Sequence, residues 1–138
     1  MRALKSDDHF EPKAKDAVIH FAEGLIGLAE YKDFVLMEKP NLTPFRLLQC
    51  VDAPHISFLV LKANMVVTNF YDYVPMREWE SMGISSAKQL AYVIVVIGST
   101  PEASSGNFQA PLLVNHEKMI GKQLILTDAV FSVHRPLV

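Results

Sequence analysis

Residues 107–123 read Asn-Phe-Gln-Ala-Pro-Leu-Leu-Val-Asn-His-Glu-Lys-Met-Ile-Gly-Lys-Gln. The amide side chains of Asn107 and Asn115 flank an apolar run, and that of Gln123 lies in the segment after the next turn. A carboxamide is neither a nucleophile nor an acid or base near neutral pH, but its donors and acceptor can hold loop backbone in place. We therefore interpret this segment as one that holds a shape and presents a surface, not as one that carries out a reaction.

The composition is that of an ordinary globular protein. The chain has 138 residues, half of them apolar and a fifth charged, and at this length roughly two-thirds of the unfolded surface can be buried. We expect one domain over residues 1–138, in which the polar residues 1–16 form a loosely held arm or an edge segment. The formal charge of −2 and the scattered Lys and Arg residues argue against a direct nucleic-acid ligand.

Short apolar runs rich in Val, Ile, Leu and Phe are separated by turn residues from residue 18 onward. Such runs suit a pleated, half-buried surface. Because the connections are short and no long helical pattern separates the runs, antiparallel pairing is favoured over strand-helix-strand crossovers. We predict an all-β fold, a mainly antiparallel barrel-like sheet of about eight strands or more, with strands over residues 18–22, 34–37, 45–51, 56–61, 65–70, 92–97, 111–114 and 123–126.

One or two short helices are expected within residues 75–90. Pro75 suits a first helical position and Gly83 supplies a C-terminal stop, which predicts a helix over residues 75–82. Residues 86–89 have the Ser and Gln spacing of a capping box, which predicts a second helix. Inside the barrel we expect the side chains of Phe21, Phe45, Leu47, Phe58, Val60, Val93, Val95, Leu113 and Ile125.

The residues that could carry chemistry form no recognisable site. The five histidines share no spacing of two or four residues, and the single cysteine, Cys50, is typical of a small buried hydrophobe. No nucleophile elbow and no glycine-rich phosphate loop is present in the sequence. We expect no catalytic residue, no metal and no cofactor.

Neither a signal peptide nor a membrane span is expected. The first residues lack an apolar stretch, and the longest apolar run, residues 90–97, is far shorter than the ~20 residues that cross a bilayer. We expect a soluble, cytoplasmic protein.

The corner Glu23-Gly-Leu-Ile-Gly-Leu28 follows the first predicted strand. Its two glycines, Gly24 and Gly27, suggest a tight backbone turn that Leu25 and Leu28 anchor inward, and the corner is either structural or in contact with a partner. From the residues alone, three classes stay open: a protein-interaction module, a constitutive adaptor, and a small-molecule-binding barrel or small enzyme with a cavity at one mouth.

Taken in order, these features resemble the flagellar assembly factor FliW family. The resemblance rests on Ile19-x-Phe21-x-x-Gly24-Leu25-x-Gly27, Pro44-Phe45, Leu48-Gln49, Asp52, Phe58, Tyr73, Asn107-x-x-Ala110-Pro111 to Asn115, and Gly121-x-Gln123. No single piece is specific, but their ordered succession over nearly the whole chain is. At the corner, Ile26 and Leu28 replace the proline and the aromatic residue usual in the family.

The resemblance implies a β-barrel protein of the cytoplasm, without catalytic activity, that has two alternating protein partners. Family members bind flagellin before its export. When flagellin is secreted, they bind the RNA-binding carbon storage regulator CsrA and relieve its repression of flagellin translation. We expect a monomer that contacts neither a membrane nor nucleic acid directly.

Two groups of residues follow from the resemblance and the segment at 107–123. The expected partner contacts are Asn107, Phe108 and Asn115, with Glu23 and Asp52 as an acidic rim. The residues expected to support the fold are Gly24, Gly27, Gln49, Ala110, Pro111, Gly121 and Gln123.

Overall fold

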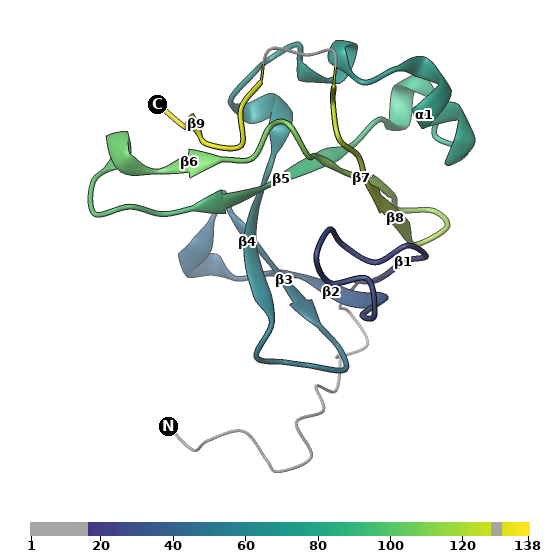
Figure 1. Cartoon of the computed structure of the whole chain (residues 1–138), viewed down its shortest axis with the longest axis horizontal. Coiled ribbons are helices and arrows are strands. Elements are labelled where there is room, and N and C mark those ends of the chain that lie inside the picture. Colours follow the sequence, from purple (N-terminus) through teal and green to yellow (C-terminus); the bar gives the residue numbers. More distant parts are fainter. Residues whose placement is uncertain (1–16, 128–130) are drawn as a thin grey trace.

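The computed structural model describes residues 17–127 and 131–138 (Figure 1). The polar arm expected at residues 1–16 lies outside the described residues. Within the described residues, nine strands form one sheet, which confirms the all-β fold class. They are β1 (Ala17–Phe21), β2 (Asp33–Glu38), β3 (Arg46–Cys50), β4 (Ser57–Lys62), β5 (Ala91–Val96), β6 (Ser105–Gly106), β7 (Leu112–Asn115), β8 (Ile120–Gln123) and β9 (Arg135–Pro136).

Seven of these strands close into a barrel. Their order is β4-β3-β2-β1-β8-β7-β5, and β5 pairs back with β4. The pairings are antiparallel except that of β1 with β8, which is parallel. β6 pairs with the second half of β5, and β9 pairs with β6, so these two short strands extend the sheet beside the barrel (Figure 1). The antiparallel barrel is as predicted, whereas the parallel closure was not foreseen.

The barrel interior is filled by side chains from alternate strand positions, because residues two apart in a strand face the same side. The Phe21 and Phe34 rings meet edge to face, with their centroids 5.7 Å apart. The set of inward residues, which we call the inner core, includes Ile19, Phe21, Phe34, Leu36, Leu48, Cys50, Val60, Tyr92, Leu112 and Val114.

A second cluster, which we call the outer core, covers the outside of the barrel wall. It takes the alternate residues of β4, β5 and β7 and adds residues from the connection between β4 and β5. These three strands are therefore buried on both faces. Burial on both faces explains why β5 reads as the continuous apolar run Ala-Tyr-Val-Ile-Val-Val. The outer core includes Leu61, Phe70, Trp79, Val93, Val95, Phe108, Leu113, Leu124, Leu126 and Phe131.

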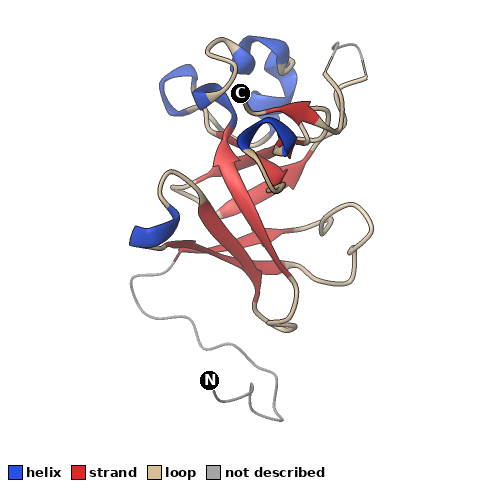
Figure 2. Ribbon diagram, turned by 90° about the vertical axis from the view of Figure 1, so that its left-hand side faces the viewer, coloured by secondary structure: helices blue, strands red, loops and turns tan. Residues whose placement is uncertain are grey.

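The connection between β4 and β5 supplies the cover of the outer core. Four of the helical segments drawn in blue in Figure 2 belong to it: η2 (Ala63–Met65), η3 (Phe70–Tyr73), α1 (Met76–Ser81) and η4 (Ser86–Lys88). Elsewhere in the part of the chain that the structure describes lie two further 3-10 turns, η1 (Pro40–Leu42) and η5 (Pro101–Ala103). Trp79 of α1 is fully buried and meets the Tyr71 ring edge to face, so this short helix is held by its packing.

The first predicted helix is confirmed and the second is not. Pro75 is the N-cap of α1, and Gly83 follows its end with a φ of +69°. The segment 86–89 forms only the 3-10 turn η4. The predicted capping box is wrong, because Ser85 is the N-cap and no side chain caps the turn.

Two predicted strands need correction. Residues 65–70 form no strand, because the chain turns there from η2 into η3 and buries Phe70 in the outer core. At 123–126 the strand begins earlier, as β8. Leu124 and Leu126 still run beside the chain before β7, since their N–H groups donate to the carbonyls of Pro111 (3.0 Å) and Gln109 (2.7 Å).

The predicted barrel interior is correct only in part. Phe21 and Val60 belong to the inner core, and Phe58 packs against it. Three of the predicted residues are buried on the other side of the wall, with Phe45 packed against them: Val93, Val95 and Leu113. Where both faces of a strand are apolar, residue type cannot distinguish the interior from the outer core.

Leu47 and Ile125 were assigned to the wrong face. Leu48 and Cys50 point into the inner core, so Leu47 between them points outward and is half-buried. Leu124 and Leu126 belong to the outer core, and Ile125 between them is 58% exposed. Both errors are shifts by one residue, which invert the two faces of a strand.

Gly121 is the position at which the parallel pairing of β1 with β8 tolerates least change. A Cβ atom at Gly121 would lie 2.4 Å from Cε2 of Phe21, whose ring is fully buried. Gly121→Ala should therefore lower the free energy of unfolding by about 1–3 kcal/mol, because extra atoms in a packed core force side chains and backbone apart. Urea denaturation measures the change, and Ser57→Ala, at an exposed position of β4, is the control. Equal stability of the two variants would contradict the tight closure.

Candidate partner-binding surface

The amides of the 107–123 segment hold loop backbone, as the sequence suggested. The Asn115 side chain is buried, donates to the Met82 carbonyl (2.8 Å), and accepts from the N–H groups of Glu117 (2.9 Å) and Lys118 (3.1 Å). It thereby joins the end of α1 to the turn between β7 and β8. Asn107 accepts from the Ala110 N–H (3.2 Å) and closes the turn before β7.

Gln123 connects two segments that are far apart in the sequence. Its Oε1 accepts from the Ile26 N–H (2.8 Å) and its Nε2 donates to the Ala110 carbonyl (3.1 Å). The corner after β1 is thus tied to the chain before β7. Gln49 has a similar role, since its Nε2 donates to the Pro54 carbonyl (3.1 Å) in the turn between β3 and β4.

The corner at residues 23–28 is a tight turn, as predicted. Gly24 and Gly27 have φ values of +68° and +82°, in the left-handed region that glycine adopts readily. Leu25 is buried and anchors the corner, whereas Glu23 and Ile26 are exposed. The corner therefore has a structural function and also offers exposed side chains beside Gln123.

Phe108 is not on the surface. Its side chain is fully buried in the outer core and its ring meets the Phe70 ring at a centroid distance of 5.5 Å. The guanidinium carbon of Arg135 lies 5.9 Å from the Phe108 ring centroid. The expectation of an exposed ring is therefore wrong, because the turn closed by Asn107 directs the next side chain into the outer core.

The remaining predicted contacts do not form one patch. Asp52 is exposed in the turn after β3, and Glu23 is exposed after β1. These residues and Asn107 are at one end of the barrel, because β1 and β3 end where β7 begins. Asn115 ends β7 at the other end and is buried. The structure thus places the acidic residues and Asn107 at one end of the barrel and Asn115 at the other.

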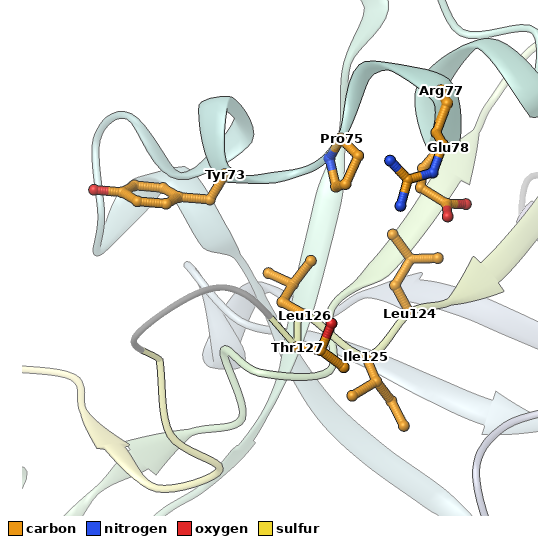
Figure 3. A pocket seen from close by; sticks show the side chains of 8 residues that line it. All are labelled: Tyr73, Pro75, Arg77, Glu78, Leu124, Ile125, Leu126 and Thr127. Atoms are coloured by element: carbon orange, nitrogen blue, oxygen red, sulfur yellow. The ribbon is translucent and has the colours of Figure 1, made fainter.

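A groove that the sequence did not reveal lies between η3, α1 and the chain that follows β8 (Figure 3). Its volume is about 140 Å³. In Figure 3, Leu124 and Leu126 point toward the helical segment, whereas Ile125 points the other way. Ile125 and Tyr73, the latter 44% exposed, place apolar surface at the rim. The lining residues are Tyr73, Pro75, Arg77, Glu78, Leu124, Ile125, Leu126 and Thr127.

The alternating pattern of residues 123–127 could have indicated part of this groove from the sequence. Residues 123–127 read Gln-Leu-Ile-Leu-Thr, so any extended conformation that buries Leu124 and Leu126 exposes Ile125. Tyr73 carried no comparable signal, because its exposure depends on how η3 packs on the barrel wall. Polar groups flank the groove: Lys122 Nζ lies 3.4 Å from Glu78 Oε1, beside Arg77.

Titratable side chains form few close pairs in the part of the chain that the structure describes. His20 Nδ1 lies 2.8 Å from Asp33 Oδ1, but both side chains are about half exposed. Burial raises the pKa of Tyr71, whose hydroxyl accepts from the Ala91 N–H. Over residues 17–127 and 131–138, no three His, Cys, Asp or Glu side chains gather to hold a metal ion, and no helix is long and apolar enough to cross a membrane.

Comparison with known proteins identifies the family. The sequence profile described as "FliW protein" matches residues 8–137. The chain belongs to the FliW family. The flagellar assembly factor FliW of Leptospira interrogans is 33% identical over 122 residues, which are 87% of this chain and 81% of the relative. The FliW protein of Geobacillus kaustophilus is 30% identical over 135 residues, 96% of this chain and 92% of the relative.

The fold is also that of a FliW protein. A crystal structure of the flagellar assembly factor FliW superposes on this chain with a TM-score of 0.81 and 27% sequence identity. The superposition covers 97% of this chain and 95% of the other. The likeness to FliW thus extends over the barrel and also over the helical cover of the outer core.

Phe108 should act on stability and not directly on binding in this FliW-family chain. Phe108→Ala removes a fully buried ring from the outer core and should lower the free energy of unfolding by about 3–5 kcal/mol. Val96→Ala, at a position that is 60% exposed, should change it by less than about 0.5 kcal/mol. Chemical denaturation followed by tryptophan fluorescence measures both changes. A Phe108→Ala variant as stable as the parent would contradict the buried position.

Proposed function

We propose that the chain is a cytoplasmic flagellar assembly factor that binds flagellin before export. Once flagellin has been secreted, the freed chain binds CsrA and antagonises it, which relieves the repression of flagellin translation. The observation that carries the proposal is membership of the FliW family over residues 8–137. The activity is one of binding and release, without a catalysed reaction.

The groove beside α1 is the surface proposed for flagellin. Its floor is formed by Leu124 and Leu126 and its rim by Ile125 and Tyr73. An amphipathic helix can lay its apolar face into such a groove. The polymerisation segments of flagellin are amphipathic helices that need cover before assembly, and Arg77 and Glu78 at the edge of the groove can pair with the polar face of such a helix.

The acidic residues that follow β1 and β3, at one end of the barrel, are proposed to favour a basic partner. Glu23 and Asp52 are exposed, and the chain carries a formal charge of −2. Opposite potentials increase the rate of encounter between proteins, so CsrA, which binds RNA, suits this surface. The same charge disfavours RNA as a direct ligand.

Packing of the barrel interior weighs against the small-molecule alternative. Large side chains from several strands occupy the inner core, among them Phe21, Phe34 and Tyr92. A ligand-binding barrel needs a cavity of a few hundred Å³ with polar groups that converge on it. The constitutive adaptor differs from the proposed function because its partners do not displace each other. The partner-exchange test below distinguishes the two.

Ile125→Asp tests the groove. A charge on an exposed apolar rim residue should weaken flagellin binding by about tenfold or more, equivalent to ~1.4 kcal/mol. The thermal midpoint should change little, since Ile125 is 58% exposed. Isothermal titration with monomeric flagellin gives the affinity. The matched control is Val96→Asp, which adds the same charge at an exposed apolar residue outside the groove. Equal flagellin affinity of both variants would rule out this groove as the flagellin site.

Partner exchange is the second test. If flagellin and CsrA report on each other through this chain, each must weaken binding of the other by the same factor. A tenfold effect requires only ~1.4 kcal/mol of coupling. Flagellin added to the preformed complex with CsrA should therefore release CsrA, as followed by size-exclusion chromatography. A ternary complex with both affinities unchanged would instead identify a constitutive adaptor.

A further inference from the structure

Charged and polar side chains close one end of the barrel interior. Next to the inward apolar residues of β2, β3 and β4, the same face of these strands carries Glu38, Arg46 and Lys62. Tyr92 of β5 pairs with Lys62 across the sheet, and His116 follows β7 at this end. We call these five residues the charged mouth. It lies at the end of the barrel opposite to Gln123.

The charged mouth contains a concave site. A pocket of about 200 Å³ is lined by four of its residues, Glu38, Arg46, Lys62 and Tyr92. The other lining residues, largely apolar, are Thr43, Pro44, Phe45 and Met65. Such a lining suits a peptide, whose side chains can pack on apolar surface while its charged groups are paired.

The hydrogen bonds within the mouth hold the Arg46 guanidinium in place. Arg46 donates to the Tyr92 hydroxyl (3.1 Å) and to Glu38 Oε2 (3.0 Å). Tyr92 is only 2% exposed, so its hydroxyl orients the Arg46 guanidinium from within the barrel. Burial also raises the pKa of Tyr92.

Glu38 marks where an incoming carboxylate can bind. Its side chain is 78% exposed, and exposed ion pairs contribute only about 0–1 kcal/mol. A carboxylate from a partner can therefore replace Glu38 on Arg46 at little cost. Among the described residues, no carboxylate lies within ion-pair distance of Lys62, so Lys62 offers a second positive charge.

The pKa of His116 responds to the positive charges at the charged mouth. Partial burial of the ring, and after it the charges of Arg46 and Lys62, lower the pKa of His116. Burial and, after it, the two cations that line the pocket thus disfavour the protonated imidazole. An anion bound between them would offset their charge and raise the pKa of His116 again.

We propose that the charged mouth binds an acidic segment of a protein partner, whose carboxylates contact Lys62 and Arg46. The surface is separate from the groove beside α1, so the inference does not depend on where flagellin binds. Nucleic acid fits less well, because the two permanent cations are accompanied by Glu38 and a neutral His116. Tight binding of a phosphate backbone requires several cations.

The test uses the full chain and a blocked peptide of sequence Glu-Glu-Phe-Glu-Glu-Leu as the probe. Nuclear magnetic resonance of the histidine rings gives the His116 pKa with and without peptide, and the shifts during titration give the affinity. The acidic peptide should bind and raise the His116 pKa, whereas the same peptide with Gln in place of Glu should do neither. Binding should weaken as salt is added, because the contacts are between charges.

Variants at two lysines localise the site. Lys62→Gln should weaken peptide binding about fivefold or more, and Lys62→Arg should restore most of it, because one charge contact is removed and then replaced. Lys32→Gln is the matched control, since Lys32 directly precedes β2 and so lies at the other end of the barrel. It should leave the affinity within about twofold of the parent.

Three results would overturn the proposal. The first is absence of peptide binding at millimolar concentration, and the second is an equal effect of Lys62→Gln and Lys32→Gln. The third is an equal rise of the His116 pKa with inorganic phosphate or a short single-stranded RNA at the same charge concentration. That result would identify a general anion site and not a peptide site.

Discussion

The parallel pairing of β1 with β8 is the constraint on which the rest of the structure depends. It consists of two residue pairs, His20 with Ile120 and Phe21 with Gly121, and it closes a sheet that would otherwise have two open edges. The closure requires Gly121, because any Cβ atom at this position would collide with the Phe21 ring. Because β1 and β8 run in the same direction, both end at the same end of the barrel. The corner after β1 therefore meets Gln123, whose amide holds Ile26 and Ala110.

Closure of the barrel also creates two separate cores with different functional consequences. The inner core fills the barrel, so that its outside and its ends are the surfaces open to a partner. The outer core attaches η3 and α1 to the wall through Phe70 and Trp79. It thereby fixes one side of the groove, while Leu124 and Leu126 form its floor. At the other end the apolar layers stop, and the next inward positions can carry the Arg46 and Lys62 charges because they reach solvent.

The amide side chains show how a polar residue can shape a surface by holding the backbone beneath it. Asn115 has three hydrogen bonds to backbone groups of α1 and of the β7–β8 turn. Buried polar groups that are satisfied in this way give a unique arrangement of the loops. In this fold, the amides hold the backbone and neighbouring apolar residues form the exposed surface. Residue type alone had suggested the reverse for Phe108, which lies in the outer core.

The amino-acid sequence was sufficient for the all-β class, the barrel, the helix at α1, the tight turn at Gly24 and Gly27, and the FliW family. These features follow from local patterns: period-two apolar runs, turn residues, a proline and a glycine around a helix, and motifs in a fixed order. Tertiary structure alone decided which face of β5 and β7 is the barrel interior, since both faces are apolar. It also decided that Phe108 is buried, that Ile125 and Tyr73 are exposed, and that Arg46, Lys62 and His116 gather at one mouth. These outcomes depend on contacts between residues far apart in the chain, and the physical reason is that burial is a property of the packed neighbours and not of the side chain itself.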